Sequence, residues 1–413
     1  MTATPDLDEP TLGFELPKIV SVDDHVVEPA HLWQTWLPAK HRDAGPRIER
    51  RGVGAMKHVG GGTYEQSFEP DGRAADCWVF EDLVYIHKRH VAAVGYSRDE
   101  MTMTPMTYDE MRPGCYDPKA RIADMELNWV DGSLCFPSFP RFCGQTFTEA
   151  KDRDLGLACV IAYNDWMVEE WCGDSRGLLI PLCIIPLWDA ELAAAEVHRN
   201  AARGVRAVCF SEIPPHLGLP SIHSGYWDSL FRACAETRTV VCMHIGSSSR
   251  MPATSSDAPV AVAATLSFNN AMASLSDFLF SGVLVRFPTL RLAYSEGQIG
   301  WLPYILERAD DVWREHRAWG GVKDIVPEPP STYYYRQIFG CFFRDQHGID
   351  SLDVVGEDNV TFETDYPHTD STWPDTKQIA AGYMQGLSEQ TAWKIMRGNA
   401  LRMLDLPSDW TGS

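Results

Sequence analysis

Residues 177–210 read GLLIPLCIIPLWDAELAAAEVHRNAARGVRAVCF, and this stretch decides the fold class of the chain. A continuous apolar run is followed by an amphipathic helical pattern and then by a second apolar run. Asp189 is the expected N-cap of the helix, and Gly204 is its expected stop. Continuous apolar strands that alternate with helices are typical of a parallel sheet covered on both faces. We therefore expect an α/β fold.

The same alternation of apolar runs and helical patterns continues along the chain and predicts a set of parallel strands. The expected strands are 18–25, 132–138, 178–186, 206–210, 239–245, 290–295, 336–342 and 359–365. This number of units fits a (β/α)₈ barrel better than an open doubly wound sheet, which usually has fewer strands and often a glycine-rich turn after the first. No G-x-G-x-x-G follows the first strand here, so we expect the barrel.

A long insertion separates the first strand from the helix expected near residues 118–129, because the connection far exceeds the usual length of a loop. It leaves the C-terminal end of a barrel strand, where it would cover the active-site face as a cap and influence substrate selectivity. The expected organisation is an N-terminal arm of residues 1–17, a barrel domain of 18–405 with the cap at 30–115, and a C-terminal tail of 406–413.

Within the cap, the sequence pattern does not decide the secondary structure throughout. Residues 52–70 predict short hairpins, whereas residues 77–90, CWVFEDLVYIHKRH, fit a strand or a helix. The cap also carries MTMTPMTY at residues 101–108 and several aromatic side chains, Trp78, Phe80 and Tyr85. These side chains would either line a large apolar pocket or form the insertion's own core, and the sequence leaves both interpretations open.

The formal net charge of −21, without any cluster of basic residues, argues against a nucleic-acid partner, since phosphates would repel the chain. No apolar run approaches the length that spans a bilayer, so we expect no membrane association. The N-terminus lacks the basic and apolar segments of an export signal, and the eleven cysteines include no C-x-x-C pair. These features predict a cytoplasmic protein with reduced thiols.

Ionisable residues gather at the expected strand ends: Asp23, His25, His244, Glu296, Asp365 and, just beyond the last strand, His368. Asp23 and His25 share one side of their strand because side chains two residues apart point the same way, whereas the side chain between them points away. Alone, a strand-end histidine is often only hydrogen-bonded, and an aspartate there is often a helix cap. Together, acids and imidazoles at one barrel rim would repel one another without a cation, so we expect a divalent metal.

A family resemblance supports this expectation. The order D-x-H (23–25), NDW (164–166), RGLLIPL (176–182), MHIG (243–246), SEGQIGW (295–301) and ETDYPHTDSTWP (363–374) resembles the amidohydrolase-2 branch of the amidohydrolase superfamily. That branch includes aminocarboxymuconate-semialdehyde decarboxylase and resorcylate-type decarboxylases. The resemblance implies a distorted (β/α)₈ barrel, a divalent metal held by Asp23, His25, His244 and Asp365, and a homodimer.

One departure from the family changes the expected chemistry. The strand-six position that typically carries a histidine reads Glu296 here, and Glu212 stands at the end of strand four, where some binuclear relatives carry a carbamylated lysine. An oxygen-rich ligand set that includes Glu296 and His368 suits iron or manganese better than zinc. In this respect the chain is similar to the amidohydrolase-fold nonheme di-iron monooxygenases of platensimycin and platencin biosynthesis.

The main expectation is therefore a nonheme di-iron monooxygenase with one or two Fe(II) per chain. It would use O₂ and an electron donor to hydroxylate a C–H bond of a hydrophobic, diterpenoid-like substrate derived from an acid. Glu296, Asp365 and His368 would be its catalytic residues. The alternative is a mononuclear zinc or manganese hydrolase or decarboxylase in which Glu296 or His368 transfers the proton. A barrel that has lost catalysis and only binds or assembles is the remaining alternative.

Two further residues are expected to bind substrate. Arg141 follows the second strand and suits a carboxylate or a phosphate, and Trp373 lies in the last family motif. The sequence leaves open which of Glu28, Glu212 and His368 completes the site.

Overall fold

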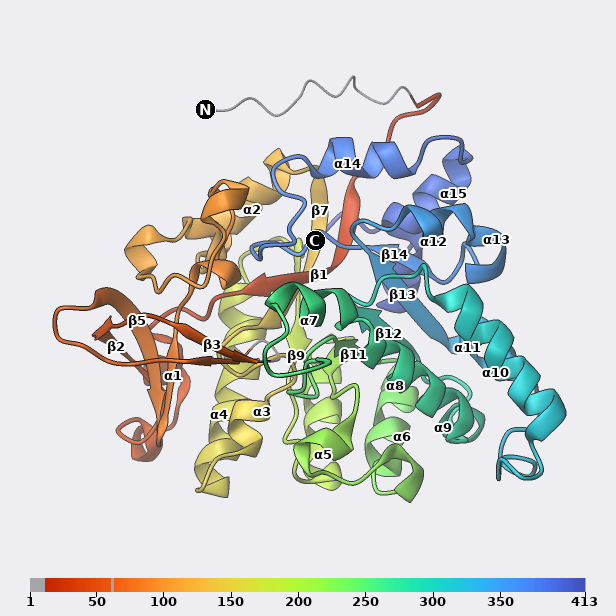
Figure 1. The fold of residues 1–413 in the computed structure, drawn as a ribbon, viewed down its shortest axis with the longest axis horizontal. Coiled ribbons are helices and arrows are strands. Elements are labelled where there is room, and N and C mark those ends of the chain that lie inside the picture. The colour runs from red at the N-terminus through yellow and green to blue at the C-terminus, as the bar shows by residue number, and fades with distance from the viewer. Residues whose placement is uncertain (1–11, 61–62, 413) are drawn as a thin grey trace.

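The computed structural model describes residues 12–60 and 63–412, and Figure 1 shows their course. Parallel strands form a ring at the centre. In ring order they are β1 (Ile19–Val26), β7 (Val130–Pro137), β8 (Leu179–Ile180) with β9 (Leu182–Cys183), β10 (Ala207–Cys209), β11 (Val240–His244), β12 (Leu292–Ser295), β13 (Ile338–Phe342) and β14 (Val360–Phe362). Each strand overlaps one of the eight ranges expected from the sequence, so the predicted (β/α)₈ barrel is confirmed.

Two details complete the ring. β8 and β9 belong to one apolar run that is interrupted at Pro181, which has no N–H to donate to a neighbouring strand. On the other side, the chain after β14 closes onto β1, because the amide of Asp365 donates to the carbonyl of Asp23 over 3.0 Å. The amide of His25 likewise donates to the carbonyl of Tyr366 over 2.6 Å. The last strand is therefore fixed to the first at the end where the ionisable residues lie.

Most helices surround the ring on its outer side, whereas α7 lies in front of the central strands in the view of Figure 1. They are α1 (Leu32–Trp36), α2 (Pro118–Leu127), α3 (Gln145–Thr148), α4 (Arg153–Trp166), α5 (Ala190–Ala201), α6 (Asp228–Thr237), α7 (Val260–Leu266), α8 (Asn269–Phe280), α9 (Val283–Arg286), α10 (Leu302–His316), α11 (Pro330–Gln337), α12 (Gln346–Asp350), α13 (Leu352–Val355), α14 (Thr376–Tyr383), α15 (Glu389–Trp393) and α16 (Asn399–Met403). The expected cap of α5 is present, since the Asp189 carboxylate accepts from the amides of Glu191 and Leu192.

The insertion after β1 builds small antiparallel sheets. One consists of β2 (Arg47–Val53), β5 (Arg73–Phe80) and β6 (Leu83–Ile86), and the other is the hairpin of β3 (Lys57–Gly60) and β4 (Thr63–Glu65). The ambiguous stretch 77–90 is therefore mainly strand, because β5 pairs with both β2 and β6. In Figure 1 the first sheet lies beside the barrel, and β3 extends from it towards α7.

Glycine is required where this hairpin meets the rest of the chain. Gly60 has φ +117°, and a Cβ there would lie 3.0 Å from the Cα of Ser256, in the loop before α7.

The aromatic side chains of the insertion divide between two roles. Trp78 and Phe80 are 0% and 2% exposed and belong to the main hydrophobic core. The Trp78 ring stacks on Phe139 at 5.1 Å and meets Trp33 edge-on at 4.9 Å. Tyr85 instead lines a cavity. The two interpretations left open by the sequence therefore apply to different residues.

Two remaining expectations concern the whole chain. The eleven cysteines all lie in the described part of the chain, where they are buried and unpaired. Within residues 12–60 and 63–412, the structure contains no helix with the length and apolar character needed to cross a membrane.

Candidate metal centre

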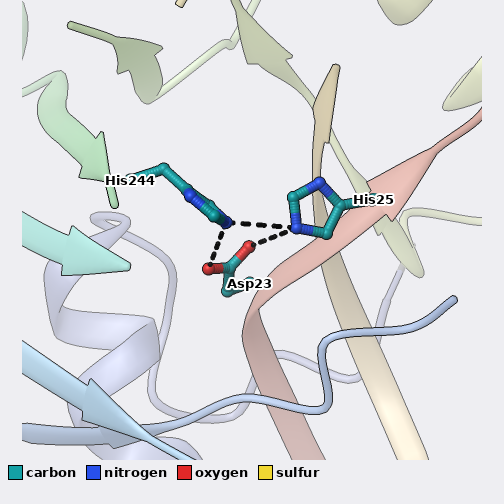
Figure 2. Close-up of side chains that lie close together, drawn as sticks. All are labelled: Asp23, His25 and His244. Atoms are coloured by element: carbon teal, nitrogen blue, oxygen red, sulfur yellow. Dashed lines mark hydrogen bonds and ion pairs between the residues drawn. The ribbon is translucent and has the colours of Figure 1, made fainter. Parts of the chain in front are cut away.

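The C-terminal half of β1 places two side chains that can bind a metal in the barrel interior. Asp23 and His25 point to the same side because strand side chains alternate, and both are fully buried. His244, the last residue of β11, reaches the same point from across the ring (Figure 2). The two imidazole Nε2 atoms lie 3.2 Å apart, and the Asp23 oxygens lie 3.5 Å from that of His25 and 3.3 Å from that of His244. These three side chains can all offer an atom to one ion.

The tautomer of His244 is fixed by its surroundings. Its Nδ1 lies 2.6 Å from the carbonyl oxygen of Ile245, which can only accept, so this nitrogen carries the hydrogen. In the neutral ring the Nε2 lone pair therefore faces Asp23 and His25, the arrangement that a metal-binding histidine needs. The ring of Phe142 stacks on His244 at 4.1 Å and helps to fix its orientation.

The segment after β14 supplies a second group of donors. The Asp365 Oδ1 atom lies 3.3 Å from the Nε2 of His25 and 3.2 Å from the Nδ1 of His368. The His25 and His368 rings stack with centroids 3.6 Å apart. Asp365 has φ +48°, an uncommon conformation for a non-glycine residue, within the turn that aims its carboxylate at β1. His25, Asp365 and His368 form a second group that can hold an ion.

Two glutamates complete the acidic side of the cluster. Glu296 follows β12 and places Oε2 3.4 Å from the Nε2 of His244. Its amide donates over 2.9 Å to Oε2 of Glu363, a residue that sequence reasoning did not identify. Glu363 stands two residues before Asp365, so the i, i+2 spacing used for Asp23 and His25 was the signal that could have found it.

The electrostatics of this cluster fit a cation. Both carboxylate oxygens of Asp23 and of Asp365 are buried without a hydrogen-bond partner among the described residues, as is Oε1 of Glu363. Burial, together with repulsion from the neighbouring acids, raises the pKa of Asp23 and of Glu296 well above the usual range. Burial raises the pKa of Glu363 to about 8.

Neighbouring histidines lower the pKa of one acid, Asp365, instead of raising it. Burial alone would raise the pKa of Asp365, but His368 and His25 lower it below its usual value. Burial also lowers the pKa of His25 far below its ordinary value and that of His244 to about 4, which leaves neutral rings that can ligate. A divalent cation would replace the protons that the crowded acids otherwise hold. Oxygen-rich sets of this kind suit manganese or iron.

Asp24 differs from its neighbour Asp23. It points out of the barrel, where its carboxylate accepts from the hydroxyls of Ser133 and Thr364 and from the amide of Tyr366 over 3.1 Å. The guanidinium of Arg121 lies close by and lowers the pKa that burial raises. Asp24 therefore ties β1 to its two neighbours in the ring and takes no part in the cluster.

Of the three residues left open by the sequence, only His368 joins the cluster. Glu28 accepts from the amides of Ser138 and Phe139, each over 2.9 Å, and so holds the loop after β7. Glu212 accepts from the amide of Gly246 over 3.1 Å and holds the loop after β11. Burial raises the pKa of both glutamates to about 7.

A cavity of about 760 Å³ adjoins the cluster, and His368 lies in its wall. Arg141 lines the same cavity, with its guanidinium 3.3 Å from the hydroxyl of Ser249 and paired with Glu149. Trp373 is not among the described residues that line this cavity. Its ring packs under the guanidinium of Arg112 at 4.6 Å and against Tyr366 at 6.3 Å. The structure thus brings Arg141 to the cavity and leaves Trp373 in a separate small core.

Comparison with solved structures supports the same architecture. An amidohydrolase from Mycobacterium avium subsp. paratuberculosis K-10 superimposes with a TM-score of 0.65 at 20% identity, covering 94% of this chain and 99% of that one. IDCase from Metarhizium anisopliae gives a TM-score of 0.63 at 16% identity, covering 94% and 97%. The 5-carboxyvanillate decarboxylase from Novosphingobium aromaticivorans DSM 12444, complexed with manganese and 4-hydroxy-3-methoxy-5-nitrobenzoic acid, gives 0.58 at 20% identity, covering 76% and 86%.

The sequence itself carries the stronger evidence. The family model described as Amidohydrolase matches residues 30–406, which is most of the chain. The matched range includes the motifs between residues 164 and 374 that carry the family resemblance. The protein belongs to the amidohydrolase family.

Proposed function

We propose that this protein is a metal-dependent decarboxylase that removes CO₂ from a carboxylic acid. The observation that carries the proposal is the convergence of Asp23, His25 and His244 on one buried point beside a cavity, with the Asp365 carboxylate 3.3 Å from the Nε2 of His25. In that cavity, Arg141 offers a guanidinium to an anionic substrate. The decarboxylating alternative of the sequence analysis thus replaces the monooxygenase as the main hypothesis.

The proposed ion is divalent, and manganese is the first candidate. Asp23, His25, His244 and Asp365 would hold it, with Glu296 next to His244 as a further ligand. When bound, such an ion acts as a Lewis acid that withdraws electron density from a coordinated substrate. The 5-carboxyvanillate decarboxylase of the same fold is a manganese complex, which supports this choice.

The chain's own residues would provide orientation and the proton. Arg141 pairs with the anionic substrate and aligns it. As CO₂ leaves, the electron pair of the broken C–C bond stays on the substrate carbon, which must then accept a proton. His368 is placed to donate it, since it lines the cavity and its Nδ1 rests 3.2 Å from Asp365, leaving Nε2 for a bound molecule. The carboxylate of Asp365 would hold the His368 ring in the orientation that lets it act as a general acid.

The test is an assay for CO₂ release under argon with the manganese-loaded protein. Hydroxylated benzoates, including 5-carboxyvanillate, are the first acids to offer. We expect release without oxygen, and His368→Gln should lower the rate by about 10²-fold to 10⁴-fold while the bound manganese stays unchanged. Hydrolysis of ester or amide substrates without CO₂ release from any acid would contradict the proposal.

A second candidate, the di-iron monooxygenase, is favoured by one specific observation. Two donor groups share His25, and four carboxylates, Asp23, Glu296, Glu363 and Asp365, surround them. That number of acids suits two divalent ions better than one. In this hypothesis His368 is a ligand of the second iron, and O₂ and an electron donor are required.

The same variant separates the two candidates. If the protein is the monooxygenase, the iron-loaded wild type should contain about two ions per chain, because each of the two donor groups would hold one. His368→Gln should then lose one ion, and turnover should stop under argon. The expected homodimer is a separate proposal, which sedimentation of the purified protein tests.

A further inference from the structure

Two large cavities lie next to each other. The inner cavity of about 760 Å³ adjoins His368, and an outer cavity of about 870 Å³ lies under the insertion. Four residues line both cavities: Tyr64, His90, Met103 and Val260. The cavities are therefore adjacent, and these four residues form the neck between them.

The walls beyond the neck are mainly apolar and adaptable. Met56, Met101 and Pro105 line the outer cavity, and Met251 and Phe142 line the inner one. Methionine side chains are flexible and polarizable, so they accommodate irregular apolar ligands.

The outer wall has two charged groups, and both have partners in the protein. Glu69 accepts from the hydroxyl of Ser67 over 3.0 Å. Arg73 is paired with Glu110, and its Nε donates to the carbonyl of Pro105 over 2.7 Å. The outer cavity therefore offers an apolar ligand more than it offers an anion. Arg141 is also paired, with Glu149, but its Nε is buried and has no hydrogen-bond partner among the described residues. This free donor and the metal cluster mark the inner end as the place for an acid group.

The neck carries a polar group without a partner. The Nδ1 atom of His90 is buried and has no hydrogen-bond partner among the described residues. Burial lowers the pKa of His90 to about 3, so the ring is neutral at ordinary pH. Tyr64, from the β3–β4 hairpin, also lines the neck.

The inner cavity alone is already within the usual range of about 300–1,000 Å³ for a small-molecule site. The outer cavity adds about 870 Å³, which a single-ring acid bound in the inner cavity would leave empty. A longer ligand could fill both cavities.

From these contacts we infer that the substrate is an elongated, apolar carboxylic acid. Its acid group lies at the inner end beside Arg141 and His368, and its apolar body passes between Tyr64, His90, Met103 and Val260 into the outer cavity. The position of the acid end rests on the proposed function. The apolar body requires only the two joined cavities.

The test measures binding, so it does not depend on turnover. Benzoate, octanoate, dodecanoate and hexadecanoate are titrated against the manganese-loaded protein by calorimetry. Each added methylene that enters an apolar cavity should tighten binding about threefold to fourfold. We expect the gain to continue through dodecanoate.

Val260→Trp fills the neck and is the deciding variant. Val260 is 37% exposed at the start of α7, so the change should not impair folding. It should weaken dodecanoate and hexadecanoate binding by at least tenfold and leave benzoate unchanged. Ala261→Trp is the matched control, because Ala261 is exposed on the same helix and does not line either cavity.

Three outcomes distinguish the claims. Equal weakening by Val260→Trp and Ala261→Trp, or affinity independent of chain length, overturns the elongated substrate and leaves the decarboxylase proposal standing. Length-dependent binding that Val260→Trp alone abolishes supports the inference. If that pattern is found but no acid of any length releases CO₂, the decarboxylase proposal fails while the joined cavities are upheld.

Discussion

Asp23 and Asp24 are adjacent aspartates and both are buried, yet their surroundings differ on the two sides of β1. On the outer side, hydroxyls, an amide and the charge of Arg121 satisfy Asp24. On the inner side, Asp23 faces other acids and the neutral rings of two histidines. A buried carboxylate is stable only with a compensating charge or donors. The outer side obtains these from the protein, and the inner side needs an ion from outside.

The largest effect should come from neutralising the inner acid. Asp23→Asn removes an expected ligand, so manganese affinity should fall by more than about 100-fold, beyond the loss typical of groups that only support a ligand. Activity should fall with it. Without metal, the variant should unfold at a temperature equal to or above that of the wild type, because repulsion among the buried acids is relieved. Calorimetric titration and thermal unfolding with and without metal measure both effects, and unchanged metal affinity would contradict the assignment.

The outer side should respond in the opposite way. Arg121→Met leaves the Asp24 charge without its cation and should lower the free energy of unfolding by about 3–5 kcal/mol. Folded protein should still bind manganese with nearly the wild-type affinity. Adding Asp24→Asn to this variant should recover part of the stability, as urea unfolding would show. If metal binding were lost as fully as in Asp23→Asn, the separation of the two sides would be wrong.

A substitution of Glu296 should change metal binding less. It tests whether Glu296 is a metal ligand or only lies close to the metal. Glu296→His restores the imidazole that is typical of the family at this position, so the protein should fold normally while its metal stoichiometry or affinity changes. We expect a shift of about tenfold in affinity, at the lower end for groups close to a metal. Metal analysis after dialysis and circular dichroism measure the two properties. A variant that binds metal and turns over as the wild type does would remove Glu296 from the centre.

The smallest effect concerns Glu212, which lies outside the cluster. Its folded pKa of about 7 exceeds the ordinary value of 4.5, so the folded state binds this proton more tightly than the unfolded state does. The stabilisation from Glu212 is thus complete below about pH 4.5 and is lost as the pH rises through about 7. Since a tenfold change in proton affinity is worth about 1.4 kcal/mol, the loss amounts to a few kcal/mol at most.

Glu212→Gln mimics the protonated form and should flatten this dependence. The difference in free energy of unfolding between variant and wild type should grow in favour of the variant between pH 5 and pH 8, as urea titrations would show. A difference that is constant across this range would mean that Glu212 is already ionised in the folded protein.

Simple rules of local geometry predicted most of the barrel and the cluster. The alternation of apolar runs and helices predicted the ring, and strand alternation placed Asp23 and His25 on one side. His244 and Asp365 followed from the rule that functional groups project from strand ends. Glu363 is absent from that set because the rule selects only the residue at the strand end, although the two-residue spacing places Glu363 on the same side as Asp365.

Other features depend on contacts that one segment cannot reveal. Arg121 stands in an ordinary helical pattern, and its place against the carbonyl of His25 arises from packing between α2 and the barrel. The strand character of residues 77–90 is fixed by the pairing of β5 with β2 and β6, which the local pattern does not reveal. The joined cavities depend on the hairpin and α7, which are distant in sequence.

Manganese binding to wild-type protein, followed through the electron paramagnetic resonance signal of the free ion, tests the central claim most directly. We expect tight uptake of at least one ion per chain by the wild type, with a higher unfolding temperature, and an affinity lower by more than about 100-fold for Asp23→Asn. Wild-type protein that bound manganese no better than this variant would show that the inner side of β1 is not a metal centre.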